Sequence, residues 1–459
     1  MEDPLVVPSK RNEYKGEWSR FYILIMFAIV NCNQCLAWFT FSSVDPDKIR
    51  DYFGANLSDS AIKWLLNWGP IMGVVCFPYQ THVLSKPKGL SRCIVIGTML
   101  VLLGNVVRSI PLLCNESFRK SDAAFGMYHL GQAAIAAGGP FIMGSVSRLS
   151  CVWFLQNERT IATAIAQTAN GLGTTLGFLI GPLFADDLNS LFWISLVAAV
   201  IPAVAFVLYC PERPRYAPSS AAEADANSLL TSSQQEDVSA VSAWIESVRR
   251  SAKHPSYVTL VLSAGVLAGA NSAWQGVLQD TLTPVGYTDS QVGYMGFANG
   301  LTGNLAAILG GYIVDRVFVK RMKAGIIVGV FGIFVTSMIF LVSVPCFLYD
   351  VAPMPTSLAT LIMMMALNGL FYGITSPLFY ELSAELIYPQ KEGLSAGTLV
   401  FVLNAVTMVV IGIDAILSYR YINFIYGIII GLLFLVLLTV KEEYRRPRNK
   451  GDSAEDGSV

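Results

Sequence analysis

Charged residues are scarce in this sequence. They make up 14% of its 459 residues, whereas soluble domains carry about a quarter. The three histidines stand apart from any cluster of cysteines or acidic residues, which excludes a metal site of the usual composition. The polar segments contain no nucleophile with a matching base and no phosphate-binding loop. We therefore expect no enzyme, no cofactor and no nucleic-acid partner.

Apolar residues take the place of charge. They make up 54% of the chain and form runs near the length of about 20 residues that a helix needs to cross a bilayer. We predict an all-α membrane protein whose twelve transmembrane helices form two six-helix halves. The predicted spans are 20–43, 62–83, 92–113, 123–146, 159–183, 190–210, 257–279, 289–313, 322–343, 357–380, 393–416 and 422–440.

Polar segments divide the chain into five parts. The prediction places a cytosolic tail at 1–19, the first half at 20–210, a cytosolic linker at 211–256, the second half at 257–440 and another cytosolic tail at 441–459. This orientation puts most Lys and Arg residues in the cytosol, as the positive-inside rule requires. The basic residues predicted on the opposite, exoplasmic side are Lys48, Arg50, Lys63, Arg119, Lys120 and Arg420.

Two short patterns bear on modification and cellular location. Asn56 and Asn115 begin N-x-S sequons in predicted exoplasmic loops, where glycosylation takes place. In the linker, Asp225 precedes Leu229 and Leu230 at the acidic-dileucine spacing that endolysosomal sorting adaptors bind. This pattern predicts sorting adaptors as partners, in addition to the lipid bilayer. The alternative is that so short a pattern arises by chance.

A charged stretch interrupts the apolar second half. GGYIVDRVFVKR, residues 310–321, places Asp315 and Arg316 between the eighth and ninth predicted spans. It resembles the cytosolic loop signature of the major facilitator superfamily, and the resemblance implies the major facilitator fold with a charge-assisted lock between the halves. Positive-inside anchoring is the alternative, although it does not require an aspartate. The corresponding loop of the first half has Ser85 in place of that aspartate.

Longer blocks narrow the family. WFLQNERTIATAI (153–165), AWQGVLQDTLTP (273–284) and FYELSAELIYPQKEG (379–393) resemble the transporter family of the feline leukaemia virus subgroup C receptors. The resemblance covers all predicted spans and is strongest to a lysosomal-membrane member. It implies transport of a small organic metabolite, with choline, ethanolamine, pyridoxine-like vitamins and haem as the family's substrates. It also implies a lysosomal membrane location, with the plasma membrane as the alternative.

Polar side chains inside the spans are the candidate substrate contacts, because they are costly in lipid. On the first span, Asn31, Gln34 and Trp38 are three and four residues apart and share a helix face. The seventh span has nearly the same arrangement with Asn271, Trp274 and Gln275. Amides and indoles that face each other could hold an amine or a small aromatic ring. The competing interpretation is that the tryptophans serve only for packing.

The family resemblance adds residue matches. Trp38 matches the first-helix tryptophan of the choline-transporting relatives, and Asn404 matches their eleventh-helix glutamine. Gly171 stands where they have a fifth-helix glutamine, beside Asn170, and Ser272 stands where they have a tyrosine. The departures favour a different amine or a vitamin over choline. Hydrogen bonding between helices is the competing role for the two asparagines.

Few ionisable residues lie in or near the spans. Asp280 follows the polar face of the seventh span and is the predicted proton carrier, while Glu381 and Arg108 are assigned to gating or coupling. A structural ion pair is the competing role for Glu381. The leading hypothesis is a secondary active or facilitative transporter of an amine-like or vitamin-like metabolite that works by alternating access, with protons as the candidate coupling ion. The alternatives are a haem transporter and a receptor or scaffold that has lost transport.

Overall fold

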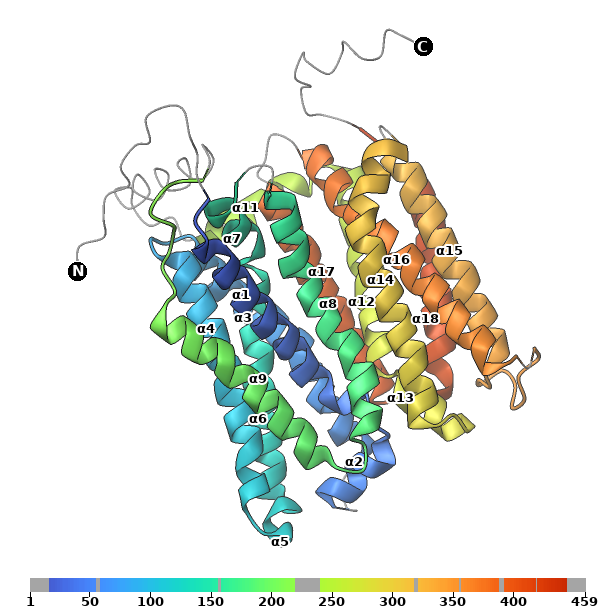
Figure 1. The fold of residues 1–459 in the computed structure, drawn as a ribbon. Coiled ribbons are helices and arrows are strands. Elements are labelled where there is room, and N and C mark those ends of the chain that lie inside the picture. Colours follow the sequence, from blue (N-terminus) through green and yellow to red (C-terminus); the bar gives the residue numbers. More distant parts are fainter. Residues whose placement is uncertain are drawn as a thin grey trace.

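The computed structural model describes residues 16–54, 58–155, 158–218, 240–317, 321–354, 356–387, 392–417 and 419–443. Helices provide the regular structure of these residues. Figure 1 shows two bundles of long helices side by side, the first coloured blue to green and the second yellow to red.

Among the described residues, each half contains six long helices. Those of the first half are α1 (Ser19–Phe39), α3 (Asp59–Leu84), α4 (Gly89–Ser109), α6 (Asp122–Met143), α8 (Arg159–Leu183) and α9 (Leu188–Leu208). Those of the second half are α12 (Pro255–Gly276), α14 (Asp289–Val317), α15 (Met322–Ser343), α16 (Leu358–Ile387), α17 (Glu392–Asp414) and α18 (Ile422–Leu438). Short elements between them include η1 (Thr40–Ser42), α2 (Pro46–Phe53), α5 (Glu116–Arg119), α7 (Val146–Trp153), α11 (Ala240–Ser251) and α13 (Leu278–Leu282). The long helices follow the predicted spans in order.

The two ends of the bundle carry different elements. α1 begins and α18 ends on one side, which we call the terminal side, and α11 lies there as well (Figure 1). α2 and α5 lie on the opposite side, which we call the α5 side (Figure 1).

Hydropathy divides the long helices into two groups. Eight of the described helices are long and apolar enough to cross a membrane, and α6 with α7 forms a ninth candidate that is bent by 42°. α18 is apolar but has 17 residues. The remaining long helices, α8 and α14, pack against each other where the halves meet. Gly171 of α8 lies against Asn304 of α14, and Gly300 of α14 lies against Thr175 of α8. These two helices are less apolar than the others because a face that meets protein need not be as apolar as one that meets lipid.

Glycine allows some helices to approach closely. A Cβ at Gly104 of α4 would lie 2.4 Å from the carbonyl oxygen of Gly131 of α6, and one at Gly131 would lie 2.6 Å from that of Gly104. No side chain larger than hydrogen fits between these backbones, so the pair brings α4 and α6 into direct contact.

The ends of α2 are set by its own sequence. Pro46 occupies the first helical position, and the Asp45 carboxylate accepts a hydrogen bond from Asp47 N at 2.9 Å. Gly54 follows the helix with a φ of 114°, a conformation that glycine adopts without strain. This short helix carries Lys48, which reaches the second half.

The linker helix α11 contacts both halves on the terminal side. The Trp244 ring lies between Phe77 of α3 and Phe401 of α17, at centroid distances of 5.2 and 5.5 Å. The rings of Phe77 and Phe401 also contact each other at 6.0 Å. α3 and α17 are therefore joined by an aromatic cluster.

Candidate substrate site and gates

Two predicted site residues from opposite halves lie against one face of α3. The Trp38 indole of α1 donates from Nε1 to Leu66 O at 2.8 Å, and a Cβ at Gly69 would lie 2.2 Å from the same nitrogen. A Cβ at Gly73 would lie 2.4 Å from Oδ1 of Asn404, on α17. Gly69 and Gly73 are one helical turn apart, about 6 Å along the axis. Trp38 and Asn404 are both half-buried, and they contact α3 at positions one turn apart.

The predicted amides of the first half form one cluster. Asn170 Nδ2 donates to Asn31 Oδ1 at 3.0 Å and to Gln34 Oε1 at 3.3 Å. Asn31 in turn donates to Ala166 O at 2.8 Å, and Gln34 donates to Ile135 O at 3.3 Å. Asn31 and Gln34 are buried, whereas Asn170 is half-buried. Asn170 is therefore the least buried member of the cluster.

The structure does not bring Trp274 to this interface. Its side chain is 2% exposed, its Nε1 donates to Asn423 Oδ1 at 2.8 Å, and its ring stacks on Tyr426 at 4.5 Å. These contacts direct the ring towards α18 in the core of the second half, rather than towards Trp38. Gln275, the next residue, is half-buried. Helical spacing identified the polar face of α12 but not the neighbour that this face meets.

A small cavity lies within the second half. It lies among α12, α16 and α17 and has a volume of about 40 Å³. Its lining residues are Ala264, Leu267, Ala268, Tyr372, Ser376, Phe379, Tyr380, Leu399 and Leu403. The space accommodates about three water molecules rather than a metabolite.

An ion-pair cluster joins the halves on the α5 side. Lys63 Nζ of α3 lies 2.8 Å from Asp414 Oδ2 of α17 and 3.7 Å from Asp280 Oδ2 of α13. It also donates to Asp414 O at 3.1 Å. The Lys63 side chain is 12% exposed and that of Asp414 1%, so the pair is shielded from water. The cluster places Asp280, the predicted proton carrier, in a contact between the halves.

A second lysine makes a parallel connection. Lys48 Nζ lies 2.8 Å from Asp186 of the first half and 3.0 Å from Asp289 at the start of α14. Gln279 also donates to Asp289 at 2.6 Å. The hydrogen bonds to Asp186 and Asp289 raise the pKa of Lys48 above its ordinary value, so this lysine stays charged. The sequence predicts only that Lys48 and Lys63 lie on the exoplasmic side. Basic residues are rare on that side, and this rarity was the available signal for a special role.

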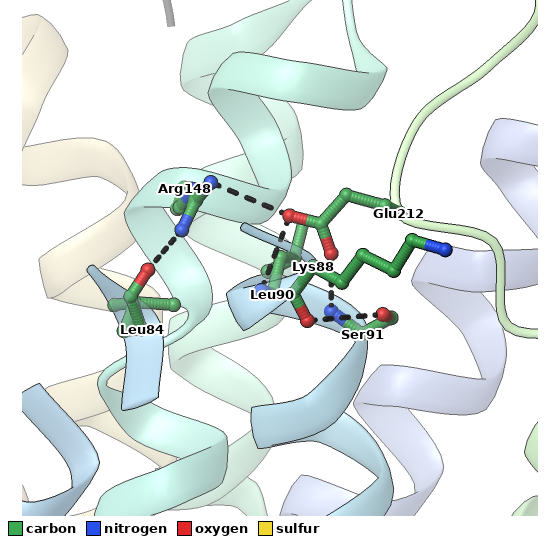
Figure 2. A network of polar contacts seen from close by, with 6 residues as sticks. All are labelled: Leu84, Lys88, Leu90, Ser91, Arg148 and Glu212. Carbon is green, nitrogen blue, oxygen red and sulfur yellow. Dashed lines mark hydrogen bonds and ion pairs between the residues drawn. The ribbon is translucent and has the colours of Figure 1, made fainter. Parts of the chain in front are cut away.

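Figure 2 shows a network of polar contacts on the terminal side of the first half. The Glu212 carboxylate accepts hydrogen bonds from Leu90 N at 3.2 Å and Ser91 N at 2.8 Å, at the start of α4. It also pairs with Arg148 of α7 at 3.3 Å, and Arg148 donates to Leu84 O at the end of α3. The carboxylate thereby interacts favourably with the positive end of the α4 dipole.

Glu212 supplies a carboxylate to the loop that lacks one. Ser85 stands in this loop where the superfamily signature has an aspartate, and Glu212 reaches the loop from the segment after α9. Glu212 lies in the predicted linker, 211–256, and this role was not predicted. The available signal was an acidic residue directly after the sixth span.

The other predicted residues are scattered. Asp315 and Arg316 belong to α14, but their side chains lie outside the part of the chain that the structure describes. Glu381 is exposed on α16. Arg108 is fully buried in the first half. Four residues with predicted roles in glycosylation or sorting lie outside the described ranges: Asn56, Asp225, Leu229 and Leu230.

Two helical halves, a polar interface between them and ion pairs that close one side of that interface define a membrane transporter. The sequence profile of the Major Facilitator Superfamily matches residues 26–350 and 257–458. The chain belongs to the Major Facilitator Superfamily.

Known relatives refine this assignment. The solute carrier family 49 member 4 homolog of Xenopus tropicalis is 27% identical, over 96% of this chain and 95% of its own. The choline/ethanolamine transporter FLVCR2 of Homo sapiens is 26% identical, over 98% of this chain and 82% of its own. These relatives confirm the family resemblance inferred from the sequence blocks.

A solved structure confirms the fold class. The inward-open form of the xylose transporter XylE from E. coli is similar, with a TM-score of 0.66 and 15% identity, over 94% of this chain and 97% of its own. At this identity the likeness concerns the fold alone.

Proposed function

We propose that this chain transports a small organic amine, or an amine-containing or pyridoxine-like vitamin, by alternating access, and that it binds this substrate between Trp38 and Asn404. The observation that carries the proposal is their contact with Gly69 and Gly73, adjacent turns of one face of α3. Residues from both halves then touch one ligand. A ligand held in this way couples its own binding to the relative movement of the halves.

The chemistry of the site favours a cation or a small ring. The half-buried Trp38 indole offers a π face, and the Asn404 and Asn170 carbonyl oxygens offer acceptors. Asn404 Nδ2 already donates to Val400 O at 2.9 Å, which leaves its Oδ1 as the acceptor for a ligand. An indole face and neutral carbonyl dipoles suit a weakly hydrated organic cation. The relative FLVCR2 is named as a choline/ethanolamine transporter.

One difference from the choline-transporting relatives alters the shape of the site. Gly171 takes the place of their fifth-helix glutamine, and a Cβ at Gly171 would lie 2.3 Å from Asn304 Oδ1 of α14. Asn304 also donates to Thr175 Oγ1 at 3.0 Å. An amide from the second half thus occupies space next to Gly171 on the first-half helix. This supports a substrate of different shape from choline.

The ion pairs on the α5 side support an alternating-access cycle. Lys63 and Lys48 hold the halves together there, and both contacts must break before the site can open to that side. Protonation of Asp280 or Asp414 would weaken the hold of Lys63, which makes this cluster our candidate for proton coupling. The opposing lock at Asp315 and Arg316 on the terminal side stays a prediction.

Thermal unfolding of the purified protein tests the proposed substrate class. Choline, ethanolamine, pyridoxine and haem would be compared over a range of concentrations, because a ligand that binds only the folded state raises the unfolding temperature. We expect a saturable rise with at least one of the first three ligands and a smaller rise in Trp38→Ala. A rise with haem alone would favour the haem alternative. No rise with any ligand would favour a scaffold without transport.

We further propose that the terminal side faces the cytosol and that the α5 side faces the lysosomal lumen. Asn115 tests this orientation, because it is exposed at the start of α5, where its Oδ1 accepts a hydrogen bond from Phe118 N. Asn115→Gln and Ser117→Ala should each remove one glycan, and Ser117→Thr should keep it. The measurement is gel mobility before and after enzymatic deglycosylation. Unchanged mobility in both removing variants would place the α5 side in the cytosol or show the sequon unused.

A further inference from the structure

Arg108 is a fully buried cation in the first half. It lies on α4 with 0% of its surface exposed, and its guanidinium is 5.1 Å from the Phe192 ring. Its hydrogen-bond acceptors are neutral: Ala37 O at 2.7 Å, Gln132 Oε1 at 3.0 Å, Asn105 Oδ1 at 3.0 Å and Ser195 Oγ at 3.5 Å. Among the described residues, no carboxylate forms an ion pair with it. A buried charge is expensive, so its environment must offer another source of negative potential.

The end of α1 provides that potential. Ala37 lies in the last turn of α1, which ends at Phe39 and continues into η1. Carbonyl oxygens in the last turn of a helix lack partners within the helix and carry the negative end of its dipole. The 2.7 Å contact between Arg108 Nη1 and Ala37 O therefore places the cation against the C-terminal end of α1. This arrangement offsets part of the cost of burying the charge.

The network continues to the backbone of Trp38. Gln132 of α6 is also 0% exposed, accepts from Arg108, and donates from Nε2 to Trp38 O at 2.6 Å. Arg108 and Gln132 together hold the carbonyl groups of Ala37 and Trp38, two successive residues. The Trp38 indole is held separately by its bond to Leu66 O.

We infer that Arg108, acting through the end of α1 and through Gln132, is a positioning residue that fixes the orientation of the Trp38 ring towards the substrate. The inference rests on the proposed function for the role of that ring. It replaces the assignment of Arg108 to gating or coupling, since every acceptor of Arg108 belongs to the first half. The network moves with the first half and holds the ring in the same place on that half throughout the cycle.

Fluorine NMR of protein labelled with fluorotryptophan tests the positioning without any substrate. The Trp38 signal is assigned by its disappearance in Trp38→Phe. We expect Gln132→Met to move or broaden this signal, because it removes the bond to Trp38 O and keeps the length of the side chain. Arg108→Lys should do the same, since a single ammonium replaces the guanidinium fork. Thr98→Val is the matched control, because Thr98 is buried on α4 and bonds to Ile94 O of its own helix.

Uptake of choline, ethanolamine and pyridoxine tests the consequence for transport. Gln132→Met should raise the half-saturation concentration of the transported compound by about three- to tenfold, and it should cause no further rise in the Trp38→Ala background. An unmoved Trp38 signal in both Gln132→Met and Arg108→Lys would overturn the inference, whatever the substrate is. A moved signal with unchanged half-saturation would support the positioning and overturn instead the proposed contact between Trp38 and substrate. If Arg108→Lys fails to fold, Gln132→Met alone decides.

Discussion

Replacing Trp38 with alanine is expected to lower substrate affinity by about five- to thirtyfold, or 1–2 kcal/mol. In the proposed site the indole supplies a π face while its Nε1 is held by Leu66 O, so its removal takes away the cation–π attraction and the stacking surface together. Trp38→Phe should retain part of the affinity, because a smaller π face remains. The measurement is uptake per molecule of correctly localised protein over a range of substrate concentrations.

Trp274 provides the matched control for this prediction. It is also a spanning-helix tryptophan with a hydrogen-bonded Nε1, but it lies in the core of the second half against Tyr426. Trp274→Phe should reduce the amount of folded protein and leave the half-saturation concentration of the remainder unchanged. Equal half-saturation in Trp38→Ala and the parent would contradict the site. Asn404→Ala should weaken binding less than Trp38→Ala, by about 1 kcal/mol, because water can replace one neutral hydrogen bond.

Replacing Lys63 with methionine is expected to open the α5 side. The variant leaves the Asp414 carboxylate, which is 1% exposed, without its cation whenever the halves are closed there. Loss of one partner of a shielded pair costs about 3 kcal/mol, on the order of a hundredfold in an equilibrium constant. Opening admits water to the carboxylate, so the closed state loses more stability than the open state. The conformational equilibrium should therefore shift towards the state that is open to the α5 side.

Cysteine labelling measures this shift. A membrane-impermeant maleimide applied from the α5 side would react with Gln275→Cys in a Cys114→Ser background, which removes the exposed native thiol. Labelling should be faster with Lys63→Met and return towards the parent rate with Lys63→Met and Asp414→Asn combined, because that pair of changes removes the most deeply shielded lone charge and leaves Asp280, whose side chain is 21% exposed. Lys120→Met is the control, since Lys120 pairs with Glu116 within one helical turn of the first half. Labelling of Lys63→Met at the parent rate would show that the cluster does not hold the halves together.

The helical architecture could be predicted because lipid imposes it. A backbone in hydrocarbon must satisfy its own hydrogen bonds, so run length alone locates spans. The same reasoning placed the amides Asn31, Gln34 and Asn170 inside the protein. Their mutual hydrogen bonds depend on how α1 and α8 rotate against each other, and periodicity contains no information about that rotation.

The candidate site could be predicted only in part. The family resemblance identified Trp38 and Asn404, and the structure places them on one face of α3. The structure does not place Trp274 beside them, because the Trp274 side chain of α12 contacts α18. The partners of Lys63 and Glu212 were also missed, since each contacts residues more than a hundred positions away in the chain. Such long-range pairs arise from the packing of the halves and loops, which local sequence patterns do not record.

Transport by purified protein in liposomes tests the central claim most directly. The chain would be reconstituted and supplied from outside with labelled choline, ethanolamine or pyridoxine, with and without an inward proton gradient, beside liposomes that contain Trp38→Ala. We predict saturable uptake of at least one of these compounds, and uptake by Trp38→Ala with a half-saturation concentration about five- to thirtyfold higher. Uptake of all three compounds no faster than in protein-free liposomes, under both gradients, would contradict the account.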